Sequence, residues 1–470
     1  MSKSYRYLVF ICLLSTITLK AQTNEWKWKS TINYPEIIIE GDTLAQPPAI
    51  ATTEDWWAAF GYPELIKLQE EAIKNNFDLK VTENNVNRSK ALLKASRASI
   101  MPSISLDPSF LRQEFSANRP IGFDAGVLPQ IRQNNFSVPL NLSYELDILG
   151  KNANTIKASG FDLQSSEAAR DDRQLQITSF VAQNFFALLA LDTEFTILER
   201  TLIIRQDNLD IVTTRFNAGL VNEIDLQRAK TELATVEVQA KGNRQLRAEI
   251  ELALAVLCGK RPGEFAIDNT LLAYLPPVVQ PVSATEASTY RPDLTQFRSD
   301  QQAAQHILDN SRKQLYPSLF IRSSFGYVSE NAGDLFQGRS RTWLVGGTIS
   351  IPLFEGFRRR AQLEVSRQEL NISENVLEQR LLEVNQEIEN ILSNIARLNE
   401  QLTAQRDFQL AAQQAAIISK QRYTKGLVTY LEVVDAERVV LDAERLSVQL
   451  LGQLYTNTVR LIVAMGGKFD

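Results

Sequence analysis

The chain reads Arg-Phe-Asn-Ala-Gly-Leu-Val at residues 215–221 and Arg-Tyr-Thr-Lys-Gly-Leu-Val at residues 422–428. The register continues beyond this motif, because Asp225 in the first copy corresponds to Glu432 in the second. It also extends backward, since a helical pattern of about 65 residues precedes each copy. Such self-similarity indicates that one structural unit of roughly 200 residues occurs twice.

The N-terminus and the cysteines indicate an exported protein. Residues 1–21 place basic residues before an apolar run and end at Ala21, which predicts a secretory signal. Cys12 follows Ile11, where a lipoprotein signal needs a small residue, so we expect no lipidation. Cys258 is then the single cysteine of the mature chain, which excludes an internal disulfide. The net charge of -5 argues against a nucleic-acid partner.

Four segments alternate apolar and polar residues, as a strand with two different faces does. The longest is 136–148, and its partner in the second copy is 343–351; two shorter segments, 104–110 and 319–327, precede them. Alternation over about ten residues is typical of a transmembrane β-strand with one face towards lipid. A soluble antiparallel sheet with one buried face is the alternative for any single strand.

Most of the remaining chain predicts long helices. No proline occurs between residues 151 and 261, or after Pro352. Apolar residues at steps of three and four predict a coiled-coil seam. The seam comprises Leu377, Leu381, Val384, Ile388, Ile391, Ile395, Leu398 and Leu402, and a seven-residue period continues with Val434, Leu441, Val448, Tyr455 and Ile462. Gly219 and Gly426 separate a long helix from its return, where a left-handed residue ends a helix.

These patterns predict an α+β fold of long helical hairpins and four β-strands per chain. Its expected parts are a signal at 1–21, a lead at 22–62, a first repeat at 63–258, a connector at 259–291 and a second repeat at 292–470. Within the repeats we expect helices at 63–98 and 292–314, β-hairpins at about 102–148 and 316–353, and tips at about 215–222 and 422–429. Four strands cannot close a barrel, and an open sheet edge in lipid leaves backbone groups unsatisfied. The chain is therefore expected to form a trimer with twelve strands.

Several motifs together resemble the TolC-type outer-membrane efflux proteins, most closely the branch that serves tripartite pumps of the resistance-nodulation-division type. They are Arg-Tyr-x-x-Gly-Leu-Val at the second tip, Arg291-Pro-Asp-Leu294, Asp55-Trp-Trp-x-x-Phe60 and Val459-Arg-Leu-x-x-x-Met-Gly-Gly467. The resemblance spans nearly the whole mature chain. It implies a homotrimer with a twelve-stranded barrel in outer-membrane lipid and a helical tunnel in the periplasm. Its implied partners are a periplasmic adaptor and, through it, an inner-membrane pump.

The resemblance also implies two functional sites. The tips that would contact the adaptor are Gly219, Leu220, Val221, Gly426, Leu427 and Val428. The periplasmic gate would comprise Glu432, Asp435, Tyr423, Asp225 and Arg228. Glu432 and Asp435 are three residues apart, which places both carboxylates on one helix face. Repeated in a trimer, such a pair would attract cations. Arg228 is expected to pair with an acid of the facing hairpin, and an ordinary solvated helix face is the alternative.

Three classes of function are compatible with these patterns. The first is a passive duct for small molecules, with type I protein secretion as its alternative cargo pathway. The second is an enzyme, which the sequence disfavours because His306 is the single histidine and no phosphate loop or catalytic triad pattern occurs. The third is a coiled-coil adaptor, which would lack amphipathic strand hairpins. We therefore expect an outer-membrane duct that needs no cofactor or metal.

Overall fold

The computed structural model describes residues 38–39, 42–43, 45, 55–117, 130–279 and 290–467. All of them belong to one unit, Ile32–Asp470. The expected signal at 1–21 lies outside the described residues. The same holds for most of the lead at 22–62, for part of the hairpin at 102–148 and for part of the connector at 259–291.

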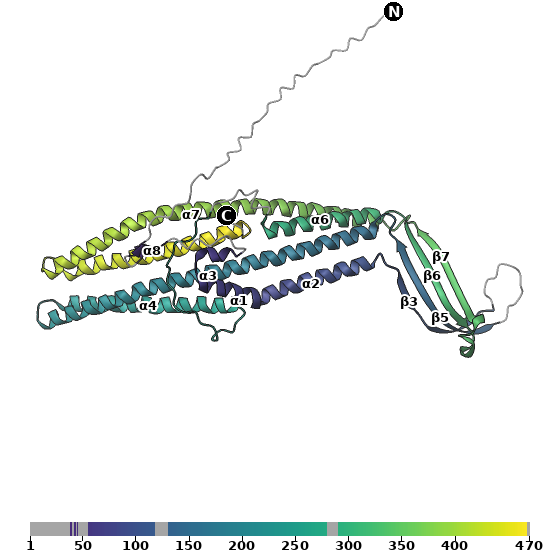
Figure 1. The fold of residues 1–470 in the computed structure, drawn as a ribbon, viewed down its shortest axis with the longest axis horizontal. Coiled ribbons are helices and arrows are strands. Elements are labelled where there is room, and N and C mark those ends of the chain that lie inside the picture. The colour runs from purple at the N-terminus through teal and green to yellow at the C-terminus, as the bar shows by residue number, and fades with distance from the viewer. Residues whose placement is uncertain are drawn as a thin grey trace, which may run out of the picture. The chain divides into compact units, whose positions relative to one another are not determined.

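The helices repeat in length as the sequence repeats. Each repeat contains a helix of 67 residues followed by one of 35 residues. The bounds are η1 Trp56–Phe60, α1 Pro63–Asn75, α2 Phe77–Ala98, α3 Lys151–Asn217, α4 Glu223–Leu257, α6 Pro292–Lys313, α7 Arg358–Thr424 and α8 Tyr430–Ala464. Figure 1 shows α4 returning along α3 and α8 returning along α7. Each pair is a helical hairpin, as the expected tips required.

The predicted apolar seam forms much of the core. From Val384 to Leu402 its members are buried, while Leu377 and Leu381 are partly buried against the same cluster. The seven-residue period of α8 is buried throughout. Apart from Val434, which belongs to a separate cluster near the tips, these residues pack together with Phe185 and with other apolar residues of α3. The coiled-coil expectation is therefore confirmed, and α3 joins the two hairpins through one core.

The single helix expected at 63–98 is wrong, because Asn76 divides it into α1 and α2. The Asn76 backbone leaves the helical region, with ψ at 130°. Its side-chain oxygen accepts from the N–H groups of Asp78 and Leu79, which caps α2, and its Nδ2 donates to the Leu257 carbonyl at 2.9 Å. Asparagine is a strong helix N-cap, and here the last turn of α4 fixes its position.

The strands form one antiparallel sheet in which β5 and β6 are the central pair. The bounds are β3 Ser103–Leu106, β4 Ser109–Phe115, β5 Ile131–Leu146, β6 Ser318–Ser329 and β7 Arg341–Ser350, with the short strands β1 Ile38–Ile39 and β2 Asp42–Thr43 pairing separately. The continuous strand expected at 104–110 is wrong, because Asp107 and Pro108 separate β3 from β4. Proline has no N–H for the ladder. Both pieces pair with β5, so the sheet has four strand positions.

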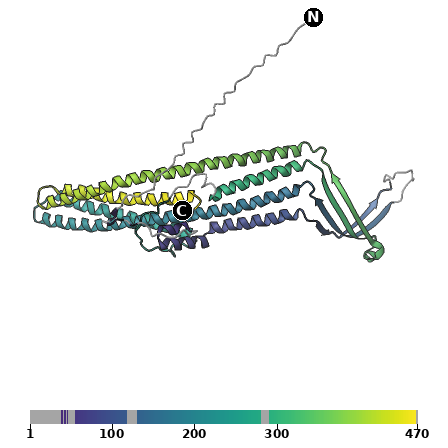
Figure 2. The ribbon, with the colours of Figure 1, turned by 45° about the horizontal axis from the view of Figure 1, so that its top comes forward.

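The order of the helices matches the order of the strands. Neighbouring helices run α2, α3, α6, α7, and neighbouring strands run β3 with β4, then β5, β6 and β7, as Figure 2 shows. Each strand connects directly in the chain to the helix at the same place in this order. The two edges of the sheet therefore continue as the two edges of the helical layer.

Two of the quoted sequence motifs anchor the end of α8. The Arg291 guanidinium donates to the Ala464 carbonyl at 2.9 Å and forms an ion pair with Asp293 at 2.8 Å. Arg380 of α7 also binds Asp293 at 2.8 Å. These two guanidiniums outweigh the effect of burial and hold the pKa of Asp293 below its usual range. At Gly466, an added Cβ would lie 2.8 Å from the Tyr290 carbonyl oxygen. The motifs are therefore structural anchors.

Among the described residues, α3 is one helix that is long and apolar enough to cross a membrane by composition. Its most apolar 18-residue window has a mean hydropathy of 1.2, and 61% of that window is buried inside the protein. Burial at this level is typical of a core helix. We therefore assign α3 to the core, in agreement with its packing against α4, α6 and α8.

Candidate functional site at the hairpin tips

Both hairpins turn through the same backbone structure. Gly219 and Gly426 have φ angles of 70° and 73°, which confirms the left-handed conformation expected at each tip. The Leu220 N–H donates to the Arg215 carbonyl at 2.9 Å, and the matching bond of the second tip measures 3.0 Å. This is the Schellman arrangement, which satisfies the last carbonyls of a helix. A Cβ built on either glycine would meet no atom of the described residues within 4 Å, apart from its chain neighbours, so these residues leave the turns open to solvent or to a partner.

The tips expose apolar side chains. Leu220 is 74% exposed and Leu427 is 66% exposed, while Val221 and Val428 are half-buried behind them. The two leucines occupy equivalent positions in the repeat. The fold therefore presents the six predicted tip residues at the ends of the hairpins, with a leucine outermost on each.

A small apolar cluster, here called the tip cluster, joins the two hairpins behind the turns. Its buried members are Val212, Leu226, Ala229, Tyr430, Val433 and Val434. Tyr423 packs on it, with its ring centroid 5.6 Å from that of Tyr430, and the Arg215 guanidinium lies 4.8 Å from the Tyr423 ring. Burial, followed by the nearby Glu437 carboxylate, raises the pKa of Tyr430 to about 12. Both copies of the repeat thus contribute to one core at the tips.

The predicted gate residues lie around the tip cluster, but their ion pairs differ from the expectation. Arg228 pairs with Asp225 of its own helix at 3.8 Å, so the expected pairing of Arg228 with the facing hairpin is wrong within one chain. Glu432 lies exposed in the first turn of α8, where a carboxylate is favoured by the helix dipole. Asp435 is also exposed and pairs with Arg438 at 4.0 Å.

Four charged residues that sequence reasoning missed connect the hairpins just behind the tip cluster. Arg205 of α3 is only 1% exposed, and its guanidinium binds Glu437 of α8. Arg438 donates from Nε to Glu232 of α4 at 3.0 Å, and Arg205 lies 3.9 Å from the same carboxylate. Asn208 also donates to Glu437. We call Arg205, Glu232, Glu437 and Arg438 the hairpin network.

The repeat itself could not reveal the hairpin network. In the register that pairs Asp225 with Glu432, the residue corresponding to Glu232 is Val439 and the residue corresponding to Arg438 is Thr231. The network therefore depends on residues in which the two copies have diverged. A charge difference between equivalent positions was the available signal, but packing decides which of these side chains is buried, as Glu232 is.

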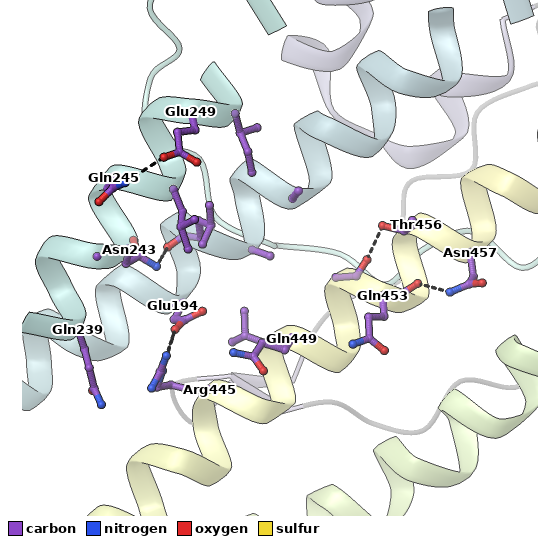
Figure 3. A pocket seen from close by; sticks show the side chains of 18 of the residues that line it. Glu194, Gln239, Asn243, Gln245, Glu249, Arg445, Gln449, Gln453, Thr456 and Asn457 are labelled. Atoms are coloured by element: carbon purple, nitrogen blue, oxygen red, sulfur yellow. Dashed lines mark hydrogen bonds and ion pairs between the residues drawn. The ribbon is translucent and has the colours of Figure 1, made fainter. Parts of the chain in front are cut away.

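A polar groove lies farther from the tips, between α4 and α8 and above α3. It has a volume of about 1050 Å³, and its lining includes the amides of Gln239, Asn243, Gln449 and Gln453 (Figure 3). Arg445 crosses it to bind Glu194 at 2.7 Å. Within the described chain no group of three or more His, Cys, Asp or Glu side chains is placed to hold a metal. Glu249 and Arg460 also line the groove, which therefore offers polar and charged contacts for solutes.

A family model described as outer membrane efflux protein matches residues 68–260 and 284–467. The chain belongs to the outer membrane efflux protein family. The two matched stretches correspond to the two copies of the repeat. Membership confirms the resemblance seen in the sequence and places the protein in the outer membrane. The family consists of channel components and is not a known enzyme class.

Individual relatives match over most of their length. The chain is 28% identical over 437 residues to the probable efflux pump outer membrane protein TtgC of Pseudomonas putida, covering 90% of this chain and 87% of that protein. It is 27% identical over 419 residues to the pyoverdine export outer membrane protein OpmQ of Pseudomonas aeruginosa, covering 88% and 87%. These relatives are outer-membrane components of export systems.

Solved structures show the same fold. The outer-membrane channel OprN superposes with a TM-score of 0.82 at 22% identity, covering 93% of this chain and 99% of that one. The outer membrane protein VceC of Vibrio cholerae superposes with a TM-score of 0.81 at 23% identity, covering 89% and 100%. The expected α+β class with long helical hairpins is therefore confirmed.

Proposed function

We propose that this protein is the outer-membrane channel of a tripartite efflux system. It works as a homotrimer and passively carries small molecules from a periplasmic adaptor and an inner-membrane pump to the exterior. The observation that carries the proposal is an open sheet in a member of the outer membrane efflux protein family. Small molecules are favoured over secreted proteins as cargo, because relatives are named for the export of toluene, antibiotics and pyoverdine.

The sheet supports the trimer because both of its edges lack a partner. Within the described residues, β7 pairs on one side only, with β6, and β3 and β4 pair on one side only, with β5. Unpaired edges are unfavourable in water and prohibitive in lipid. Three copies joined edge to edge supply twelve strand positions, enough for a barrel with a lumen. The outward apolar residues of β7, such as Trp343, Val345 and Ile349, would then meet lipid.

The helices support a tunnel that continues from the barrel. Because the helices keep the order of the strands, closing the sheet edges also brings α7 of one copy beside α2 of the next. Both are edge helices in the single chain and carry exposed apolar residues, such as Val81 on α2 and Ile372 on α7. A closed ring of helices around a wet lumen would protect solutes crossing the periplasm.

The tips are proposed to contact the adaptor and to form the gate. Leu220 and Leu427 expose apolar surface at the ends of the hairpins, which suits docking of another protein. Glu432 and Asp435 lie just behind them, and a threefold ring of these carboxylates would attract cations to a constriction. The hairpin network also contributes to the proposed gate, because it links the α7–α8 hairpin, which carries these two acids, to the α3–α4 hairpin.

Deletion of the gene tests the proposal. The deletion strain is expected to become sensitive to toxic small molecules, and the intact gene should restore resistance. A Gly426→Trp protein should form the same heat-labile trimers in the membrane yet fail to restore resistance, because the bulky side chain blocks the tip. Gly160→Trp, at a helical glycine with open space around its Cβ position, is the control. Unchanged resistance in the deletion strain together with impaired protein secretion would favour the secretion pathway.

A further inference from the structure

The connection from β7 to α7 combines exposed aromatic residues with arginines. Leu353 is 92% exposed, Phe354 is 78% exposed and Phe357 is 65% exposed. Arg358, Arg359 and Arg360 follow as the first residues of α7. We call residues 353–360 the basic junction. It lies where the sheet leads into the helical layer, at the green ends of β7 and α7 in Figure 2.

The basic junction contains an exposed aromatic residue with a strained backbone conformation. Phe357 has a φ of 64° and is the single non-glycine residue with a positive φ among the described residues. A bulky residue in the left-handed region is a rare outlier that costs on the order of 1 kcal/mol or more. The ring contacts Phe354 edge to face at 5.9 Å and the Arg360 guanidinium at 6.0 Å, and it remains 65% exposed. Burial of the ring within the chain therefore does not offset the cost of this backbone conformation.

The charges of the basic junction oppose the helix dipole. The N-terminus of a helix is electropositive and favours acids, as at Glu223 of α4 and Glu432 of α8. The first turn of α7 carries no acid and begins with three arginines. No side chain caps it. An arrangement of this kind is stabilised when an anion binds at the same place.

Glu355 supplies one negative charge against three positive ones. It binds Arg358 at 2.5 Å and Arg359 at 2.8 Å, and Arg359 also donates to the Gln314 carbonyl. Arg360 has no carboxylate partner in the described part of the chain, and its guanidinium lies 6.0 Å from the Phe357 ring. A hollow of about 310 Å³ is lined by these arginines together with Leu353, Phe354 and Leu315. Glu355 also lines it, so the hollow combines three guanidiniums and one carboxylate with apolar side chains.

We propose that the basic junction binds an anionic phospholipid, with the lipid phosphate on Arg358 and Arg360 and the acyl chains against Leu353, Phe354 and Phe357. The inference rests on the proposed function, which places the sheet in the outer membrane. Arginine binds phosphate through two parallel N–H groups, and aromatic residues favour the membrane interface. The other helix-to-strand connections also expose apolar residues, including Met101, Ile148 and Tyr316. The basic junction differs from them in placing three consecutive arginines beside its exposed apolar residues.

Lipid retention by the purified full-length protein in a neutral detergent tests this inference. Native mass spectrometry is used to compare phosphatidylglycerol with phosphatidylcholine of the same acyl chains. The wild type is expected to retain phosphatidylglycerol preferentially. Replacing both Arg358→Gln and Arg360→Gln should weaken that retention about tenfold or more, since each basic residue near a lipid surface contributes about 1 kcal/mol. Arg367→Gln, in an exposed ion pair on the same helix, should change nothing.

The remaining outcomes separate the alternatives. Equal retention of both lipids by the wild type, or an unchanged preference in the double variant, would overturn the lipid site while leaving the channel intact. Displacement of phosphatidylglycerol by excess inorganic phosphate alone would assign the site to a free anion. Disulfide-linked chains formed through Phe354→Cys would instead make the junction a contact between copies. A wild-type protein that stays soluble without detergent would overturn the proposed function and the lipid site together.

Discussion

Arg438 of α8 donates to Glu232 of α4, with the Arg438 Nε 3.0 Å from the Glu232 Oε2. The Glu232 side chain is buried and the Arg438 side chain is half exposed. This ion pair joins the end of one hairpin to the end of the other, although α4 packs mainly on α3 and α8 mainly on α7. Any movement that separates the two tips must break it.

Loss of this ion pair is expected to loosen the tips. Glu232→Gln should lower the free energy of unfolding by about 1.5–3 kcal/mol, the usual contribution of a hydrogen bond to a charged group. It should also raise the conductance of the trimer in planar bilayers. The double variant with Arg438→Gln should cost less than the sum of the two single variants, because they remove one shared interaction. Arg397→Gln, in an exposed pair within α7, is the control and should have little effect. Strict additivity would contradict the coupling.

The acids behind the second tip are expected to set ion selectivity. Glu432→Ala combined with Asp435→Ala should reduce the cation preference of the trimer and its block by multivalent cations. In planar bilayers, the reversal potential measures the preference and the loss of current measures the block. Glu400→Ala, an exposed acid farther along α7, should leave both unchanged. If selectivity survives in the double variant, the constriction lies elsewhere.

Arg228→Ser with Tyr423→Phe should raise the conductance of the trimer in planar bilayers. Because the Tyr423 hydroxyl has no hydrogen-bond partner in the described chain, its removal should cost little stability.

The two faces of β5 are expected to differ in their tolerance of charge. Leu142 belongs to the apolar face and Ser143 to the polar face. Leu142→Arg should destabilise the membrane-inserted protein by about 2–4 kcal/mol, while Ser143→Arg should cost less because the proposed barrel turns the polar face towards a wet lumen. The measurement compares the amount of oligomer on gels of unheated and heated samples. Equal effects of the two substitutions would rule out a membrane strand here.

Gly259 is expected to tolerate no side chain. Its φ is 66°, and an added Cβ would lie 2.6 Å from the Asn75 carbonyl oxygen, so Gly259→Ala should destabilise the protein by about 1–3 kcal/mol or more. Gly242→Ala is the matched control, since that residue is helical with open space around its Cβ position. It should stabilise the protein by about 0.5–1 kcal/mol. Thermal unfolding in detergent measures both, and a neutral Gly259→Ala would contradict the close contact.

Cys258 is expected to be unreactive while the protein is folded. Burial raises the pKa of its thiol to about 11. In the unfolded chain the thiol has a pKa of about 8.5 and therefore ionises first. This difference lowers the free energy of unfolding as the pH rises from about 8.5 to about 11. Alkylation near neutral pH should therefore require denaturant. Mature protein should then show one thiol per chain, and a second thiol would show that Cys12 and the signal were retained.

Local patterns were sufficient to predict the helical hairpins. The spacing of Val384 and Ile388 along one helix face determines which side is buried, whatever that side contacts. The backbone requirement of a tight turn determines the conformation of Gly219 and Gly426 in the same way. For these features the interacting residues are close in sequence, so the pattern and its physical cause can be read together.

Contacts between distant segments were decided by the tertiary structure alone. Asn76 ends one helix and begins the next because the Leu257 carbonyl accepts its amide, and no local pattern includes that partner. Arg205 and Glu437 are 232 residues apart in the chain, and each is an ordinary charged residue of an amphipathic helix until packing removes it from water. Burial is what makes such a charge depend on one partner, and burial is a property of the assembled hairpins. The sequence alone therefore determined the repeat, the hairpins and their turns, whereas the fold decided which charges hold the tips together.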